Sequence, residues 1–159
     1  MRILIAAIGK ARNGPFSDLT DDYIFRCSKL APNLGFNPVT LIECEAPKNL
    51  SGELRTDAEA ALLLKASDQS IRIALDEKGR NMTTKEFSAL LARLRDDGNK
   101  STAFLIGGAD GHGDALRDKV DHKISFGAAT WPHMLVRAML AEQLYRTMTL
   151  LAGHPYHRA

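Results

Sequence analysis

Short runs of apolar residues alternate along the chain with longer segments in which apolar positions recur every three or four residues. The short runs are typical of buried strands, and we expect five of them, at residues 3–8, 39–44, 71–75, 102–106 and 123–126. The periodic segments predict helices at residues 17–30, 51–65, 83–97, 114–120 and 132–151. Because strand and helix alternate, residues 1–159 are expected to form a single α/β domain with a mostly parallel sheet covered on both faces.

The apolar positions also predict which helix faces are buried. The helix that begins at Thr83 or Thr84 has apolar residues spaced for one buried face, at Phe87, Leu90, Leu91 and Leu94. In the next helix towards the N-terminus, which Ser51 is expected to cap, Leu54, Ala58, Ala61, Leu62 and Lys65 recur at helical spacing. The last helix is apolar around most of its circumference. It is therefore either the central helix of the domain or buries a second face against another subunit.

Composition narrows the class of protein without naming a function. The 159 residues are 45% hydrophobic and 25% charged, as in an ordinary globular domain with its own core. No run approaches the roughly 20 apolar residues that a membrane span needs. Lys10 and Arg12 follow the apolar start of the chain, which favours a buried strand over a signal peptide. Cys27 and Cys44 lack CxxC spacing and are expected to be reduced thiols, which predicts a cytoplasmic protein.

The net charge of +2 arises entirely near the end of the chain. Residues 133–159 hold Arg137, Arg146 and Arg158 against Glu142 alone, so three positive charges minus one negative charge give +2. This imbalance is either chance in a short segment or an edge that meets an anionic partner. No spacing of histidine, cysteine and carboxylate residues indicates a metal site.

Three segments follow predicted strands and are therefore expected to meet at one edge of the sheet, where parallel sheets bind ligands. They are residues 75–79, 105–113 and 127–133. The second contains Gly107, Gly108, Gly111 and Gly113 in an order that matches neither a Walker A loop nor a dinucleotide fingerprint. Glycines let the backbone approach a flat ligand and adopt positive φ at little cost, although a tight strand-to-helix turn would use them equally well.

The third segment and the end of the chain suit different partners. Residues 127–132 are small and nearly uncharged, which suits an apolar ligand edge, and Trp131 either stacks on a ligand or belongs to the core or an interface. Residues 154–158 combine imidazole, aromatic and guanidinium groups, which suit exposed bases and phosphates. The alternative for this terminus is a frayed polar end.

Four motifs together carry a family resemblance: LIGG at 105–108, WPHMLVR at 131–137, EQLYR at 142–146 and HPYHR at 154–158. In order and spacing, the chain resembles the ribosomal RNA large-subunit methyltransferase H family of the SPOUT class. The resemblance implies a C-terminal trefoil knot and a homodimer whose active site lies at the subunit interface. It also implies that S-adenosylmethionine is used to methylate N3 of a pseudouridine in 23S rRNA of the large subunit, on the assembled ribosome.

The resemblance also implies roles for individual residues. The cofactor would be bound by Leu75, Gly107, Gly108, Gly127, Ala128, Ala129, Thr130, Trp131 and Pro132. The substrate RNA would be contacted by His133, Arg137, Tyr156, His157 and Arg158. Arg146 and His157 are the candidate catalytic residues. The chain departs from the family pattern at Ala109, Asp110 and Trp131, where Pro, Glu and Leu are common.

The chemistry of this reaction leaves one choice open. N3 of a uracil-like ring carries a proton, which either a histidine of ordinary pKa about 6.5 removes or an arginine makes easier to lose by stabilising the anion. Two other functions remain open as well. They are a non-catalytic RNA-binding or ribosome-associated α/β protein and a nucleotide-binding enzyme of flavodoxin-like topology, neither of which requires S-adenosylmethionine.

Overall fold

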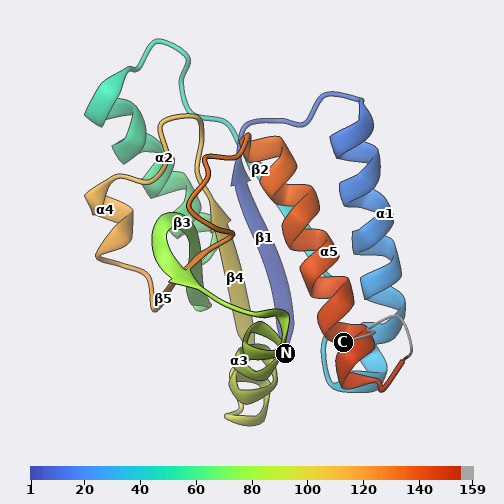
Figure 1. The fold of residues 1–159 in the computed structure, drawn as a ribbon. Coiled ribbons are helices and arrows are strands. Elements are labelled where there is room, and N and C mark those ends of the chain that lie inside the picture. The colour runs from blue at the N-terminus through green and yellow to red at the C-terminus, as the bar shows by residue number, and fades with distance from the viewer. Residues whose placement is uncertain (155–159) are drawn as a thin grey trace.

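The computed structural model describes residues 1–154 and has three layers, with a sheet between two sets of helices (Figure 1). The strands are β1 (Arg2–Ile8), β2 (Thr40–Cys44), β3 (Ile71–Asn81), β4 (Ser101–Ile106) and β5 (His122–Ser125). The helices are α1 (Pro15–Leu30), α2 (Gly52–Ala66), α3 (Thr84–Asp96), α4 (Asp114–Arg117) and α5 (His133–Leu151), and the 3-10 turn η1 (Ala31–Leu34) follows α1.

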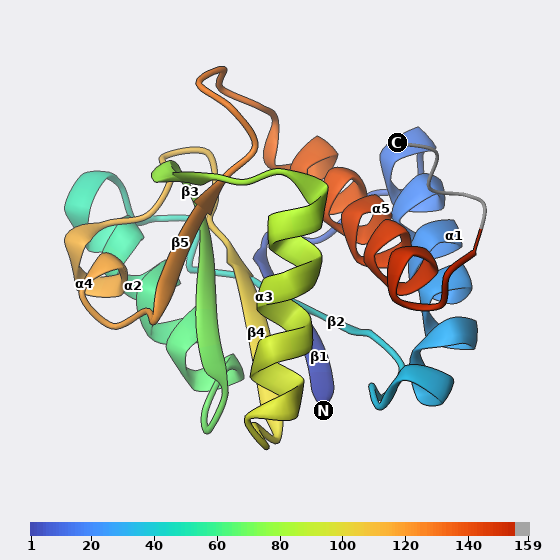
Figure 2. The same ribbon diagram turned by 60° about the horizontal axis from the view of Figure 1, so that its bottom comes forward.

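The five strands form one sheet in the order β2-β1-β4-β3-β5, and every pair of neighbours is parallel. β4 lies at the centre and is buried along its whole length. Helices α1, α3 and α5 cover one face, while α2 and α4 cover the other (Figure 2). The predicted α/β domain with a parallel sheet covered on both faces is confirmed.

Each face of the sheet has its own apolar core. Phe104 of β4 packs with residues of α3 and α5 on one side, and Leu105 packs with Leu63 and Leu116 of α2 and α4 on the other. Complete burial of each such side chain contributes about 1.5–3 kcal/mol. Burial also raises the pKa of the Cys27 thiol to about 12, so this free cysteine stays protonated and unreactive. Within residues 1–154, no helix is long and apolar enough to cross a membrane.

Most element boundaries agree with those expected from the pattern, and Thr83 forms the N-cap of α3 within a capping box completed by Glu86. The largest difference in length is in β3, which continues to Asn81 instead of ending at Leu75. Residues 76–81 are polar or glycine and have no strand periodicity, so the sequence pattern contains no signal for this extension.

The residues at helical spacing in α2 are only partly the ones that it buries, since Leu62 packs against the core beneath α2 while Ala61 is exposed. The helix buries Glu59, Ala60 and Leu63, whereas Leu54 is 70% exposed. The spacing did not indicate Glu59, because an apolar pattern treats a glutamate as a surface residue. Here the Glu59 side chain turns inward and accepts a hydrogen bond from Arg55 at 3.0 Å.

The extension of β3 crosses the edge strand β5 at very short range. Ile124 pairs with Leu75 before the register shift and with Arg80 after it. The first part of β3 and its extension therefore pair with the same residue of β5. Between them, an ideal Cβ built on Gly79 would lie 2.5 Å from the carbonyl carbon of Ile124. The two backbones are therefore in direct contact, and any side chain at position 79 would separate them. The trefoil knot that the family resemblance implies stays a prediction.

We predict that Gly79→Ala greatly destabilises the protein, because the new methyl group meets backbone atoms that cannot move aside without breaking the β3–β5 pairing. The expected loss is at least about 3 kcal/mol of unfolding free energy, measured by urea denaturation. Gly14→Ala is the matched control, since its Cβ would meet only the Arg12 carbonyl oxygen, at 3.9 Å. Equal stability of the two variants would show that the crossing is looser than described.

Candidate functional site

A cleft of about 270 Å³ opens at the carboxyl edge of the sheet, where β3, β4 and β5 end their main pairing. It is lined by residues of all three segments that follow these strands, so the predicted meeting of the segments is confirmed. Of the residues expected to bind a cofactor, seven line the cleft: Leu75, Gly107, Gly108, Gly127, Ala129, Thr130 and Trp131. Ala128 and Pro132 belong to the same loop but are outside the lining.

The glycine segment after β4 is both a tight turn and a wall of this cleft. Gly108 and Gly111 form an isolated antiparallel bridge, and the Gly111 amide donates to the Gly108 carbonyl oxygen at 3.2 Å. Gly111 has φ +71°, a conformation that favours glycine, but Gly107 and Gly108 do not have positive φ. Close packing explains these two glycines instead, because a Cβ on Gly107 would lie 2.9 Å from the Gly111 carbonyl oxygen.

Glu59 of α2 lies directly behind Gly108. A Cβ on Gly108 would be 2.8 Å from Glu59 Oε1 and 2.9 Å from Oε2. The residue is 3% exposed, and Oε1 accepts the hydrogen bond from Arg55 Nε while the buried Oε2 has no hydrogen-bond partner within the described residues. Sequence reasoning missed Glu59 as part of the site. Its helical position next to apolar residues could have suggested burial, but nothing in the sequence links it to Gly108.

A buried ion pair supports the side of the cleft that β3 forms. Arg117 Nε of α4 donates to Asp76 Oδ2 at 2.8 Å, and the Lys78 amide donates to Asp76 Oδ1 at 2.8 Å. Burial alone would raise the pKa of Asp76, but these hydrogen bonds and the charge of Arg117 hold it below its ordinary value. His112, which lies 3.3 Å from the Leu105 carbonyl oxygen through Nε2, has its pKa lowered by burial and is neutral at pH 7. Asp76 and His112 lie within the segments predicted to form the site, whereas nothing in the sequence indicated that Arg117 belongs to it.

The loop between β5 and α5 forms the outer wall. Gly127 has φ +108°, a conformation that favours glycine, and a Cβ at this position would meet no atom within 4 Å. The Gly127 amide donates to Ser125 Oγ at 3.2 Å, which holds the loop against the strand end. Trp131 is 42% exposed and donates from Nε1 to the Phe126 carbonyl oxygen at 3.3 Å. Trp131 is therefore not a core residue, and its indole ring is available at the cleft for stacking.

His133 and Arg137 begin α5, but only His133 lines the cleft. Burial lowers the pKa of His133, and the charge of Arg137 lowers it further, so this histidine is neutral at pH 7. Arg137 is 1% exposed and donates to the carbonyl oxygens of Ile8 and Gly9 at 2.7 and 2.6 Å. It also donates to Glu43 Oε1 at 2.7 Å. The guanidinium thus ties α5 to the ends of β1 and β2 and presents no face for RNA.

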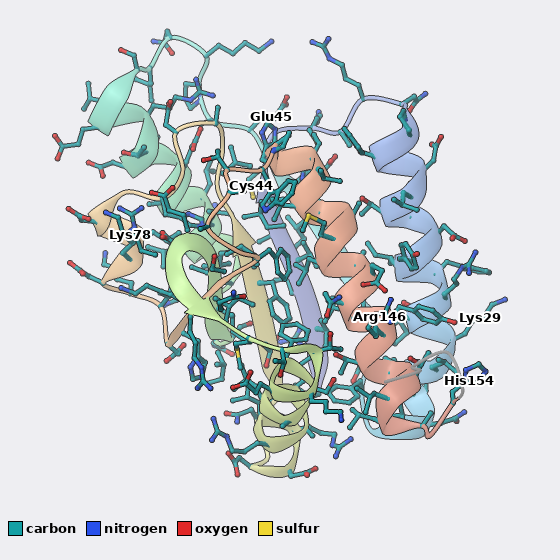
Figure 3. The ribbon with its side chains drawn as sticks, in the orientation of Figure 1. Lys29, Cys44, Glu45, Lys78, Arg146 and His154 are labelled. Atoms are coloured by element: carbon teal, nitrogen blue, oxygen red, sulfur yellow. The ribbon has the colours of Figure 1, made fainter. Side chains whose placement is uncertain are left out.

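Arg146 is not at the cleft. It lies in the second half of α5, on the side of the molecule that carries Lys29, whereas Lys78 projects on the opposite side (Figure 3). Arg146 Nε donates to Glu142 Oε1 at 2.8 Å, and Glu142 lines a second groove of about 470 Å³ between α1, α3 and α5. Ile124, Ser125 and Phe126 line both the groove and the cleft. Tyr156, His157 and Arg158, the remaining predicted site residues, lie outside the described residues.

No set of three or more histidine, cysteine or acidic side chains in residues 1–154 is arranged to hold a metal ion. What the cleft offers a ligand is main chain from the glycine segment, apolar surface from Leu75, Ile106 and Trp131, and carboxylates at its rim. This combination suits a flat apolar group with a positive charge attached.

The chain matches the family model described as "Predicted SPOUT methyltransferase" over residues 1–157, and it therefore belongs to the SPOUT methyltransferases. It is 50% identical to the ribosomal RNA large subunit methyltransferase H of Paramagnetospirillum magneticum, over 99% of both chains. It is 49% identical to the protein of the same name from Hyphomonas neptunium, over 100% of both chains. Within the SPOUT class, this chain is a member of the ribosomal RNA large subunit methyltransferase H family, as its motifs indicated.

Solved structures show the same fold at low sequence identity. A probable methyltransferase from Bordetella pertussis is similar with a TM-score of 0.53 at 12% identity, over 92% of this chain and 93% of that one. A probable methylase family protein from Haemophilus influenzae also has a TM-score of 0.53, at 13% identity, over 99% of this chain and 70% of that one.

We predict that Gly108→Ala weakens binding of S-adenosylhomocysteine, and that Glu59→Ala in the same chain restores part of the loss. The methyl group at position 108 would meet the Glu59 carboxylate at 2.8 Å and push the cleft wall inward, and removal of the carboxylate would make room. A double-mutant cycle by calorimetry measures this coupling. If the two effects simply add, the glycine is required for ligand contact and not for packing against Glu59.

Proposed function

We propose that this protein uses S-adenosylmethionine to methylate N3 of a pseudouridine in 23S rRNA, acting on the assembled ribosome. The observation that carries the proposal is the cleft at the carboxyl edge of the sheet, in a chain that belongs to the large subunit methyltransferase H family. The names of the relatives specify ribosomal RNA of the large subunit, and the pseudouridine and its N3 come from the motif resemblance. A ribosomal substrate would place the protein in the cytoplasm.

The residues of the cleft fit the methyl donor. Adenine is flat and apolar on its faces, and Leu75, Ile106 and Trp131 offer apolar surface for it. The main chain of the glycine segment can pair with the polar edge of the base at short range. The sulfonium and amino groups of the donor are positive, and the acidic side chains at the cleft suit them.

The bound donor supplies a methyl group on a positively charged sulfur, which makes the carbon open to attack without a metal. On the protein side, the requirement is to hold N3 of the base in line with that carbon and to take up the N3 proton. As the new N–C bond forms, the C–S bond breaks, a neutral thioether is left and the N3 proton passes to a base. We assign the proton to His157 and the stabilisation of the anion to Arg146, with His133 positioned at the cleft to contact the RNA.

The protein acts as a homodimer in this proposal. Arg146 and the cleft lie apart within one chain, and the groove beside α1 and α5 adjoins the cleft, since Ile124, Ser125 and Phe126 line both. A second copy seated on this groove would bring its own α5 and terminus to the wall of the first copy's cleft. Leu19 of α1, which lines the groove and is 42% exposed, belongs to the apolar surface that such a contact would cover.

We predict that light scattering of the wild-type protein gives twice the 17.4 kDa mass of one chain and that Leu19→Glu gives a monomer. Leu19 lines the groove, where a buried carboxylate without a partner would oppose association. Phe25→Glu is the control, because Phe25 lies on the same helix, is 60% exposed and does not line the groove. A monomeric wild type at micromolar concentration would contradict the homodimer.

The function is tested by incubating purified ribosomes with methyl-labelled donor and mapping the modified nucleotide. We expect the wild-type protein to label one pseudouridine in 23S rRNA. We expect a chain that lacks residues 156–159 to bind S-adenosylhomocysteine normally but to label no RNA. An aromatic stack contributes about 1–3 kcal/mol per base, and an arginine contact contributes roughly 1.5–3 kcal/mol. Loss of both would weaken the productive complex by roughly 10² to 10⁴.

Three results would argue against parts of this proposal. A wild-type protein that binds ribosomes but not the methyl donor would be a non-catalytic ribosome-associated protein. Full labelling by the shortened chain would make residues 156–159 dispensable. Loss of S-adenosylhomocysteine binding by the shortened chain would show that the terminus completes the donor site.

A further inference from the structure

The charges at the cleft are predominantly negative. Among residues 1–154, Asp76, Glu77 and Asp110 line it against one arginine, Arg117, whose guanidinium is already paired with Asp76 at 2.8 Å. The two histidines of the lining, His112 and His133, are neutral at pH 7 because burial lowers the pKa of each. An anionic ligand would therefore be repelled at this site, and a cationic one would be attracted.

Glu59 adds a buried negative charge directly behind this surface. It is 3% exposed, and its carboxylate lies against Gly108, which lines the cleft and has no side chain, since a Cβ there would be 2.8 Å from Oε1. Its partner Arg55 is 41% exposed, so water screens the positive charge of the pair more than the negative one. Oε2 is buried without a hydrogen-bond partner in the part of the chain that the structure describes. Such an oxygen is costly to bury, and the cost falls if a cation binds nearby.

We propose that Glu59 makes the cleft distinguish the charged methyl donor from its neutral product. The inference rests on the proposed function, in which the ligand carries a sulfonium before transfer and an uncharged thioether afterwards. Glu59 does not touch the ligand. It acts through the thin glycine wall, so that the attraction present while the sulfur is positive is lost when the methyl group leaves. The glycine at position 108 serves this role because any side chain there would displace the carboxylate.

The test compares three ligands that differ only at the sulfur position and its substituent: S-adenosylmethionine, S-adenosylhomocysteine and sinefungin, which carries an amine-bearing carbon in place of the sulfur. Calorimetry is carried out on the wild type and on Glu59→Gln, which keeps the size of the side chain and removes its charge. We expect the substitution to weaken the two cationic ligands by about tenfold, as for charges that interact through a poorly screened wall. S-adenosylhomocysteine should change by less than about twofold.

Glu53→Gln is the matched control, since Glu53 is an exposed residue in the first turn of the same helix and its substitution changes the net charge equally. It should leave all three affinities unchanged. Arg55→Gln provides the opposite test, because it removes the screened partner of Glu59 and should increase the preference for the cationic ligands. If Glu59→Gln fails to fold, Arg55→Gln still tests whether the charge at Glu59 affects ligand affinity.

The outcomes separate the inference from the function beneath it. If Glu59→Gln weakens binding of all three ligands equally, Glu59 only holds Gly108 in place. If it changes none of the three affinities, the charge of Glu59 does not affect ligand binding. Either result overturns the inference while the methyl donor site stands. A wild-type protein that binds none of the three ligands would instead overturn the proposed function.

Discussion

The backbone contact between Gly79 and Ile124 is the constraint on which the rest of the site depends. β5 has only four residues and lies at the edge of the sheet, so pairing along one side would hold it weakly. The extension of β3 crosses it and pairs with it a second time, at Arg80 and Asn81. This double contact fixes the point from which residues 126–132 leave the sheet. The outer wall of the cleft and the start of α5 take their positions from it.

Polar groups, and not only apolar packing, hold the opposite side of the site. Arg137 is among the largest fully buried side chains, and its guanidinium joins α5 to the ends of β1 and β2 through two carbonyl oxygens and Glu43. Glu43 Oε1 also accepts the Ala11 amide at 2.7 Å, so the loop after β1 belongs to the same network. Removal of one partner would leave another buried charge uncompensated, which is why such networks tolerate little change. The arginine that sequence reasoning assigned to RNA is thus part of the framework.

The sequence predicted the architecture well because the apolar runs of parallel strands and the periodicity of helices are local signals. Five strands, the parallel sheet, the Thr83 cap and the meeting of three segments all followed from such signals. What it could not predict depends on contacts between distant residues. The β3 extension has no pattern of its own, and Glu59 and Arg117 acquire their roles from Gly108 and Asp76, which lie 49 and 41 residues away in the chain. Leu54 is exposed and Glu59 is buried, against the usual preference of each residue type, because contacts with distant residues decide which face of α2 is covered.

Two of the crowded glycines, Gly79 and Gly108, differ in whether a substitution elsewhere could make room for a side chain. The obstacle at Gly79 is the main chain of Ile124, which every type of residue carries, so no change elsewhere can make room for a side chain. The obstacle at Gly108 is the side chain of Glu59, which one substitution can shorten. Position 79 must therefore remain glycine in any related sequence that keeps the crossing of β3 and β5, whatever residues stand elsewhere. As far as packing is concerned, positions 59 and 108 are restricted as a pair, because a shorter residue at position 59 would make room for a side chain at position 108.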